Sequence, residues 1–222
     1  MTNDQPSKRQ YNSQRRQLQA LATRQSILEA AQLLFERDGY VPTTMDAIAV
    51  EAGVALKTVY IAFTTKSGLL RALWDLLLKG DREDASVAQR AAYRGLLDEP
   101  DPERKLRLNA RNARLVKTRI GRILSVIRSA SVVDDDCAAL WQLIQTDFYE
   151  NQRVIVADID RRGGLRSGLG VADATDILWT LNHPDVWLLL HNERGWTPEQ
   201  FETWFGDITC NQLLDERAPA AP

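Results

Sequence analysis

The stretch that decides the fold runs from Thr43 to Lys66 and has the sequence TTMDAIAVEAGVALKTVYIAFTTK. It predicts two short helices joined by a tight turn at Gly53, a residue that adopts backbone angles other residues avoid. Apolar residues recur at the offsets of one buried face, namely Ile48, Ala49, Ala52, Val54, Val59 and Ala62. Hydrogen-bond donors lie between them and must point outward. This division is typical of a helix-turn-helix, whose second helix enters a major groove of DNA.

An ordinary helical hairpin is the competing interpretation, because glycine between two short helices is common. The pattern fits many offsets at once, which favours the DNA-binding unit. From Thr23 to Leu77 the chain also resembles the DNA-binding domain of TetR-type transcriptional regulators. The resemblance rests on the run A-x-x-A-G-V-x-x-x-T-V-Y-x-x-F-x-x-K-x-x-L, present as Ala49, Ala52, Gly53, Val54, Thr58, Val59, Tyr60, Phe63, Lys66 and Leu69.

The outward positions supply the candidate DNA contacts. Thr44 is a good N-cap for the first helix of the pair, and the resemblance implies that it also contacts a phosphate. Lys57 can reach a base edge or a phosphate, and Thr58 can offer its methyl group to a thymine or its hydroxyl to a phosphate. The resemblance further implies that Tyr60 and Lys66 bind the DNA backbone. We expect Lys57 to determine base preference, and Tyr60 and Lys66 to determine affinity.

One position departs from the family pattern. Members of the family usually have Ser or Thr where this chain has Ala55. Serine and threonine cap helices through a side-chain oxygen, which alanine lacks. The second helix of the pair is therefore expected to begin without a side-chain cap.

Residues 1–20 are polar and basic and are expected to form a flexible arm. Lys8, Arg9, Arg15 and Arg16 supply its positive charge. Two interpretations stay open: a solvated tail, or an arm whose arginines 15 and 16 reach phosphate or a minor groove beside the recognition helix.

The distribution of charge supports a DNA-binding end. The whole chain of 222 residues has a formal net charge of −2. Residues 1–80, however, contain ten Lys and Arg against seven Asp and Glu, and the remainder contains eighteen against twenty-three. No apolar run is long enough for a membrane span and the N-terminus has no apolar signal region, so a cytoplasmic location without membrane partners is expected.

The order of elements predicts an all-α protein with two domains. An amphipathic helix from Leu21 to Arg37 precedes the helix-turn-helix, and a very apolar connector helix over residues 65–79 follows it. Gly80-Asp81 marks the expected boundary between a DNA-binding domain at 21–80 and a helical effector-binding and dimerisation domain at 81–217. The resemblance implies a homodimer formed by the C-terminal helices. A palindromic operator fits such a dimer, since two recognition helices read two half-sites.

The second domain shows long helical patterns and no strand pattern. Helices are expected over residues 84–97, from Arg104 to Arg128, after Asp134 to about Arg162, and from Thr197 to about Leu214. Val171 to Asn192 is strongly apolar, and Pro184 is expected to kink it near Thr180.

The segment from Arg104 to Arg128 is unusually basic, with nine Lys and Arg and no acid. Arg104, Arg107, Arg111 and Arg114 have the spacing of one helical stripe. Three interpretations remain. The stripe is a solvated face paired with acids elsewhere, or some arginines face inward to bind an anionic effector, or they lie above the DNA and add to the electrostatic attraction between protein and DNA.

The resemblance implies a repressor that a small-molecule effector releases from DNA by binding between helices of the second domain. Aromatic residues on long helices are the candidate pocket residues, namely Trp141, Phe148 and Trp179, with Arg119 or Arg128 as polar anchors. Burial in the core is the competing and favoured interpretation for each of them.

An enzyme is not expected. The two histidines, His183 and His191, lie eight residues apart without a carboxylate cluster at metal-ligand spacing. The sequence contains no serine nucleophile elbow, Cys-x-x-Cys pair or phosphate loop, so neither catalytic residues nor metal or cofactor sites are predicted. A ligand-binding protein that has lost DNA binding is a third class, which Tyr60 and Lys66 argue against.

Overall fold

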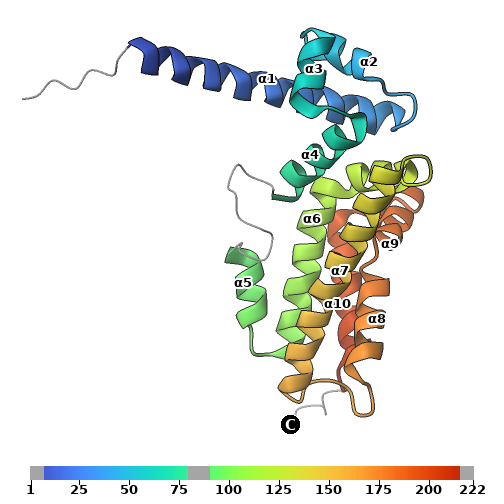
Figure 1. Ribbon diagram of the computed structural model, residues 1–222. Helices are drawn as coiled ribbons and strands as arrows, with labels where there is room; N and C mark the ends of the chain where they lie inside the picture. Colours follow the sequence, from blue (N-terminus) through green and yellow to red (C-terminus); the bar gives the residue numbers. More distant parts are fainter. Residues whose placement is uncertain (1–7, 80–90, 216–222) are drawn as a thin grey trace, which may run out of the picture.

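The computed structural model describes residues 8–79 and 91–215, and every regular element in these two segments is a helix (Figure 1). The predicted all-α class is therefore confirmed for the described chain. The upper module consists of α1 (Lys8–Asp38), α2 (Met45–Glu51) and α3 (Leu56–Phe63). The connector helix α4 (Lys66–Lys79) leads from it to the second module.

The second module is a helical bundle. Its elements are α5 (Ala91–Asp98), α6 (Pro102–Ala130), α7 (Asp135–Arg161), α8 (Val171–Leu181), α9 (Pro184–Leu188), a π-helical turn η2 (Leu189–Glu193) and α10 (Pro198–Leu213). Helix α6 is central, because it contacts α4, α5, α7, α9 and α10. The predicted boundary at Gly80-Asp81 and the predicted start of the helix at residue 84 lie outside the described residues.

Side-chain caps fix where several helices begin. Asp101, Asp134 and Thr197 accept hydrogen bonds from backbone N–H groups in the first turns of α6, α7 and α10. These caps agree with the helix beginnings expected after Asp134 and at Thr197. The apolar run from residue 171 is not one kinked helix: α8 ends at Leu181, and Pro184 begins α9 because proline fits the first turn of a helix but not its interior.

Helix α1 is longer than the sequence pattern indicates. It begins at Lys8, so Arg15 and Arg16 lie on a helix and not on a flexible arm spanning residues 1–20. Both arginines are exposed. Since this part of the helix is polar all round, the apolar periodicity from Leu21 onward could not predict its true start. Residues 1–7 are not described.

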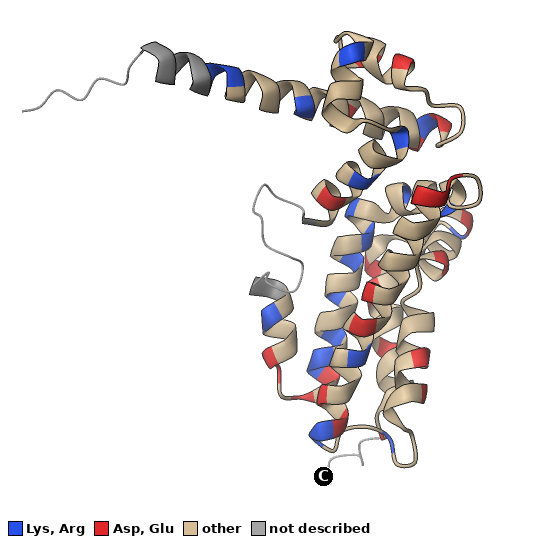
Figure 2. Cartoon of the chain, viewed as in Figure 1, with Lys and Arg blue, Asp and Glu red and all other residues tan. Residues whose placement is uncertain are grey.

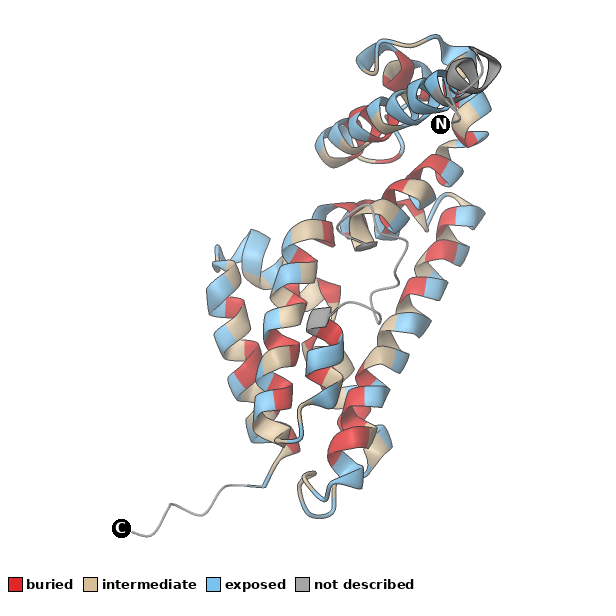
Figure 3. Ribbon diagram, turned by 90° about the vertical axis from the view of Figure 1, so that its left-hand side faces the viewer, coloured by how far each residue is buried: buried red, intermediate tan, exposed pale blue. Residues whose placement is uncertain are grey.

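The buried residues form two clusters, and their division does not follow the two modules. They lie on the faces that the helices turn toward one another (Figure 3). The first cluster joins buried residues of α1 to α4 with the end of α6 and the beginning of α7, including Ile127, Leu140 and Ile144. The second cluster fills the lower bundle around Phe201 and Phe205. The upper module therefore shares its core with the nearest ends of α6 and α7.

None of the helices within the described ranges combines the length and the apolar character needed to cross a lipid bilayer.

Candidate functional site

Helices α2 and α3 are joined by a turn at Gly53, whose φ is +66°. The N–H of Val54 donates to the carbonyl of Ala49 at 3.0 Å and closes this turn. Ile48 and Val59 are fully buried where the helices meet, and Ala49 is 2% exposed. A small residue at the crossing lets the two backbones approach, so the orientation of α3 is fixed by packing on its inner face.

The opposite face of α3 is open to solvent. Lys57 is exposed, Tyr60 is 50% exposed, and Thr58 is half-buried at the edge of this face. Ile61 is 75% exposed beside them. The sequence pattern did not identify Ile61, because it is one more apolar residue in an apolar stretch.

The two helices begin differently. The Thr44 hydroxyl accepts a hydrogen bond of 3.0 Å from the N–H of Ala47, which confirms that Thr44 caps α2. Ala55 occupies the corresponding position of α3, with φ −68° and ψ 141° and no side-chain hydrogen bond to the helix. The prediction that α3 lacks a side-chain cap is confirmed.

Lys66 binds protein backbone in this structure. Its ammonium donates to the carbonyls of Tyr40 at 2.8 Å and Thr43 at 3.0 Å, and lies 4.1 Å from the centre of the Tyr40 ring. Burial lowers the pKa of Lys66. Lys66 therefore ties the beginning of α4 to the turn that leads into α2.

Arg24 of α1 supports the end of α3, a role that the sequence pattern did not indicate. Its guanidinium donates to the carbonyl of Ala62 at 2.8 Å and lies 4.1 Å from the centre of the Phe63 ring. The carbonyls in the last turn of a helix lack partners within the helix, so a guanidinium there stabilises the helix end.

The junction between α3 and α4 is strained at Thr64. Its φ of +58° lies in the left-handed region, where a β-branched residue is unfavourable. The Thr64 N–H still donates to the Tyr60 carbonyl at 2.9 Å and ends α3. The chain thus turns sharply between the helix that faces solvent and the connector helix.

A cavity of about 530 Å³ lies between the connector helix α4 and the helices α6 and α7 of the second module. Most of its wall is apolar and includes Trp74 and Leu78 of α4, Ile120 of α6, and Leu140 of α7. Polar groups line another part of the wall: Asn109, Lys117, Gln152 and Asn182. A largely apolar wall with a few polar groups is typical of small-molecule sites.

Of the five predicted pocket residues, only Phe148 lines this cavity. Trp141 packs against the upper core, and Trp179 makes an edge contact with His183 with ring centres 5.0 Å apart. Arg119 donates to the carbonyls of Leu77 and Leu78 at 2.6 and 3.0 Å. Arg128 forms an ion pair with Asp185. Sequence periodicity showed which residues lie on apolar faces, but not which faces border a cavity.

Several basic residues of α6 form ion pairs with acids. Figure 2 shows Lys and Arg along α6, whereas Asp and Glu are frequent on α7 and α8. Arg107 contacts Glu103 at 3.0 Å and Asp207 at 2.9 Å, and Arg114 forms ion pairs with Glu199 and Glu202. These contacts agree with the interpretation of a face paired with acids. Two lysines of the segment, Lys105 and Lys117, are instead buried.

The two modules are joined by polar contacts at the corner between α6 and α7. Tyr40 donates a hydrogen bond of 2.6 Å to Asp134, and Ser67 donates one of 2.9 Å to Asp136. Arg119 binds the last turns of α4 from the side of α6, as described above. The connector helix is therefore held by the bundle through its first and last turns.

Both histidines have structural contacts. Nδ1 of His183 accepts from the N–H of Asp185 at 3.2 Å and caps α9. The ring of His191 stacks on Trp187 at 5.0 Å, and its Nδ1 lies 2.7 Å from the carbonyl oxygen of Trp196.

Comparison with known proteins gives similarity across most of the chain. The sequence model of the family described as "Bacterial regulatory proteins, tetR family" matches residues 27–73. The Pseudomonas putida protein described as "Probable HTH-type transcriptional regulator ArpR" is 30% identical over 180 residues, which cover 78% of this chain and 83% of that protein.

Solved structures of similar fold include NalD, described as the secondary repressor of the MexAB-OprM multidrug efflux pump in Pseudomonas aeruginosa. It has a TM-score of 0.67 and 21% identity, and the match covers 89% of this chain and all of that one. A complex of SmeT with triclosan has a TM-score of 0.62 and 19% identity, over 88% of this chain and 93% of that one.

Proposed function

We propose, since this chain belongs to the TetR family and is a helix-turn-helix transcriptional regulator, that it represses transcription at a palindromic operator and is released by a small-molecule effector. The observation on which the proposal depends is the two-sided character of α3. Val59 and Phe63 are buried on its inner face, while Lys57 and Tyr60 are exposed to solvent on its outer face. A rigid helix with exposed donors can enter a major groove.

In this proposal Lys57 contacts a base edge, Tyr60 donates to a phosphate, and Thr58 and Thr44 contact the backbone at the flanks. The exposed Ile61 is added to this set, because an apolar side chain on the outer face can pack against a thymine methyl group. Lys66 contributes mainly by fixing the turn before α2, since its ammonium already binds two carbonyls. Arg15 and Arg16 extend the basic surface along α1 toward neighbouring phosphates.

A homodimer would present two copies of α3 to the two half-sites of one duplex. We assign the dimer contact to α8 and α10, which pack side by side in the bundle (Figure 1). Ile177 and Trp204 on these helices are only partly buried in the single chain. A second copy would complete their burial.

The cavity is the proposed effector site. Four residues of α4, including Trp74 and Leu78, form part of its wall, so an occupant touches the connector helix directly. The ligand complex of SmeT with triclosan supports a small molecule as the occupant in a protein of this fold. An effector that prefers a displaced α4 would change the separation of the two α3 helices, and a few kcal/mol of differential affinity suffices.

The decisive experiment is selection of DNA fragments from the source genome by the purified full-length protein. We expect recovery of a palindromic sequence, with affinity that falls steeply as salt concentration rises. Binding without sequence selection, or without salt dependence, would contradict the proposed function. Genes beside the recovered fragments would indicate the chemistry of the effector.

A further inference from the structure

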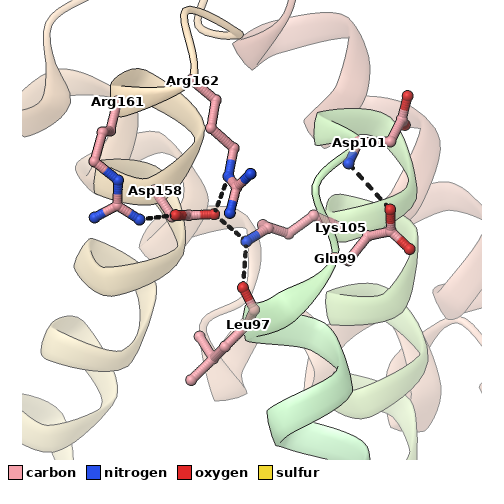
Figure 4. A network of polar contacts seen from close by, with 7 residues as sticks. All are labelled: Leu97, Glu99, Asp101, Lys105, Asp158, Arg161 and Arg162. Atoms are coloured by element: carbon pink, nitrogen blue, oxygen red, sulfur yellow. Dashed lines mark hydrogen bonds and ion pairs between the residues drawn. The ribbon is translucent and has the colours of Figure 1, made fainter.

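Helix α6 contains two buried lysines, and only one of them has a carboxylate partner. Lys105 is fully buried and forms an ion pair with Asp158, which also binds Arg161 and Arg162 (Figure 4). Its ammonium donates in addition to the carbonyl of Leu97 at 2.8 Å. The positive charge of Lys105 is therefore compensated within the protein.

Lys117 is in the opposite situation. It is 5% exposed and donates to the backbone carbonyl of Asn182 at 2.7 Å and to the side-chain oxygen of the same residue. Its ammonium also lies 4.7 Å from the centre of the Phe201 ring. Among the residues that the structure describes, no carboxylate lies within ion-pair distance of Lys117. Burial lowers the pKa of Lys117 well below the ordinary value, because no nearby negative charge offsets the loss of hydration of its ammonium.

The polar groups beside Lys117 are amides held by long hydrogen bonds. Gln152 accepts from Asn109 at 3.4 Å and from Asn182 at 3.3 Å, and its own amide nitrogen lies 3.5 Å from the carbonyl of Phe148. Normal N–H···O bonds are shorter than these. An ammonium and three amides have more donor hydrogens than the carbonyl oxygens among them can accept, so this cluster can bind additional acceptor atoms.

All four residues of this cluster line the cavity described above. The carboxylates of the cavity wall, Asp75, Asp147 and Glu150, are exposed side chains. Asp75 lies 3.9 Å from Arg71, and Glu150 pairs with Arg153 at 2.5 Å. The buried end of the cavity thus has a lysine and amide donors, while the remaining buried wall is apolar apart from the hydroxyl of Tyr93, which donates to Asn151 at 3.2 Å.

We propose that the effector is an amphipathic organic anion, whose carboxylate binds Lys117 and the amides of Asn109, Gln152 and Asn182. The inference rests on the proposed function of the cavity as the effector site. A bound anion supplies the counter-charge that Lys117 lacks, and charge-assisted hydrogen bonds in a site shielded from water are the strong ones. The apolar part of the anion lies along Ile120 and Leu140 toward α4, where it contacts Trp74.

The test uses full-length protein and a panel of mono- and bicyclic aryl carboxylates, each paired with its own uncharged primary amide. Binding is measured by titration calorimetry and by the shift of the thermal unfolding midpoint. We expect each bound carboxylate to bind about tenfold or more tightly than its amide. Lys117→Met keeps the length and apolar stem of the side chain and should abolish this preference. Lys105→Met, which removes the other buried lysine of α6, should retain it.

Three results would overturn the inference, and they are distinguishable. Equal binding of acids and amides to the unaltered protein would leave the cavity as a ligand site but refute the anion, and this comparison needs no variant. A preference for acids that persists in Lys117→Met would place the anion elsewhere. Failure of both series to bind would refute the inference, while selection of DNA fragments would still decide the proposed repression independently.

Discussion

The hydroxyl of Tyr40 donates a hydrogen bond of 2.6 Å to a carboxylate oxygen of Asp134, and so links the turn after α1 to the residue that precedes α7. The Asp134 carboxylate also caps α7 through the N–H of Cys137 at 3.1 Å. Burial would raise the pKa of Asp134, but these hydrogen bonds outweigh it and hold the pKa below the ordinary value. One side chain therefore both begins a helix and joins two modules.

Tyr40→Phe should lower the free energy of unfolding by about 1 kcal/mol, because it removes one hydrogen bond to a charged acceptor and leaves the ring stack with Phe35 in place. Chemical denaturation of both proteins measures the difference. Tyr149→Phe is the matched control: its hydroxyl binds Asp176 on the surface, so a smaller loss is expected. If both variants lost equal stability, the hydrogen bond between Tyr40 and Asp134 would stabilise the protein no more than a surface contact does.

Tyr60→Phe should weaken binding to all recovered operator fragments by about 0.5–1.5 kcal/mol, because a phosphate contact is independent of sequence. Competition binding against a set of fragments measures this. Tyr149→Phe, which lies far from α3 along the chain, again serves as the control and should bind normally.

Lys57→Ala should act differently, by changing the ranking of operator fragments. Loss of a base-edge contact costs about 1–3 kcal/mol on the preferred sequences and little on the others. Binding measured over the same fragment set distinguishes this change of ranking from the uniform loss expected for Tyr60→Phe. A uniform loss, with a salt slope reduced by about one, would assign Lys57 to a phosphate instead.

Ala55→Ser should raise the free energy of unfolding by about 1 kcal/mol, because the extended backbone at position 55 suits an N-cap and the helix now lacks one. Thr44→Ala, which removes the existing cap of α2, should lower it by a similar amount. Thermal unfolding of the free protein measures both. An unchanged or lower stability of the serine variant would show that the first turn of α3 is already satisfied by other means.

Asp158→Asn should reduce stability by about 3 kcal/mol at pH 7, because it leaves the buried ammonium of Lys105 without its counter-ion. Burial alone would raise the pKa of Asp158, but Lys105 and Arg162 hold it at about 2. The stabilisation is fully present above the unfolded pKa of about 3.9 and is lost as the pH falls toward about 2.

Unfolding midpoints measured from pH 7 down to pH 2 check this dependence. The difference between the unaltered protein and Asp158→Asn should shrink below about pH 4. A constant difference across this range would mean that the ionised carboxylate of Asp158 is not what stabilises Lys105.

The sequence predicted the helix-turn-helix well because its signals are local. Gly53 is needed for one backbone angle, Thr44 caps the helix that follows it, and the spacing of Ile48, Ala49 and Val59 defines a single buried face. Each of these depends on residues a few positions apart. Local chemistry therefore placed these elements without knowledge of the tertiary contacts.

The cavity could not be predicted, because it depends on contacts between residues that are far apart in the chain. Lys117 belongs to a run of basic residues, and nothing in its sequence neighbourhood separates it from Arg114, which pairs with surface acids. Its burial depends on Asn182 and Phe201, which are distant in the chain. The same holds for the arginines predicted as anchors. Arg119 binds carbonyls of α4 and Arg128 pairs with Asp185, and only the tertiary fold brings these partners near.

The core that unites the upper module with the nearest ends of α6 and α7 limits how this regulator can be rearranged. A chimera that joins residues of α1 to α4 to the helical bundle of a relative would cut through one packed cluster, and Leu70 and Leu73 would meet foreign side chains. The exchangeable unit is therefore larger than the motif: it includes the corner around Ile127 and Leu140. Engineered sensors built from this chain should keep that corner with the DNA-binding helices.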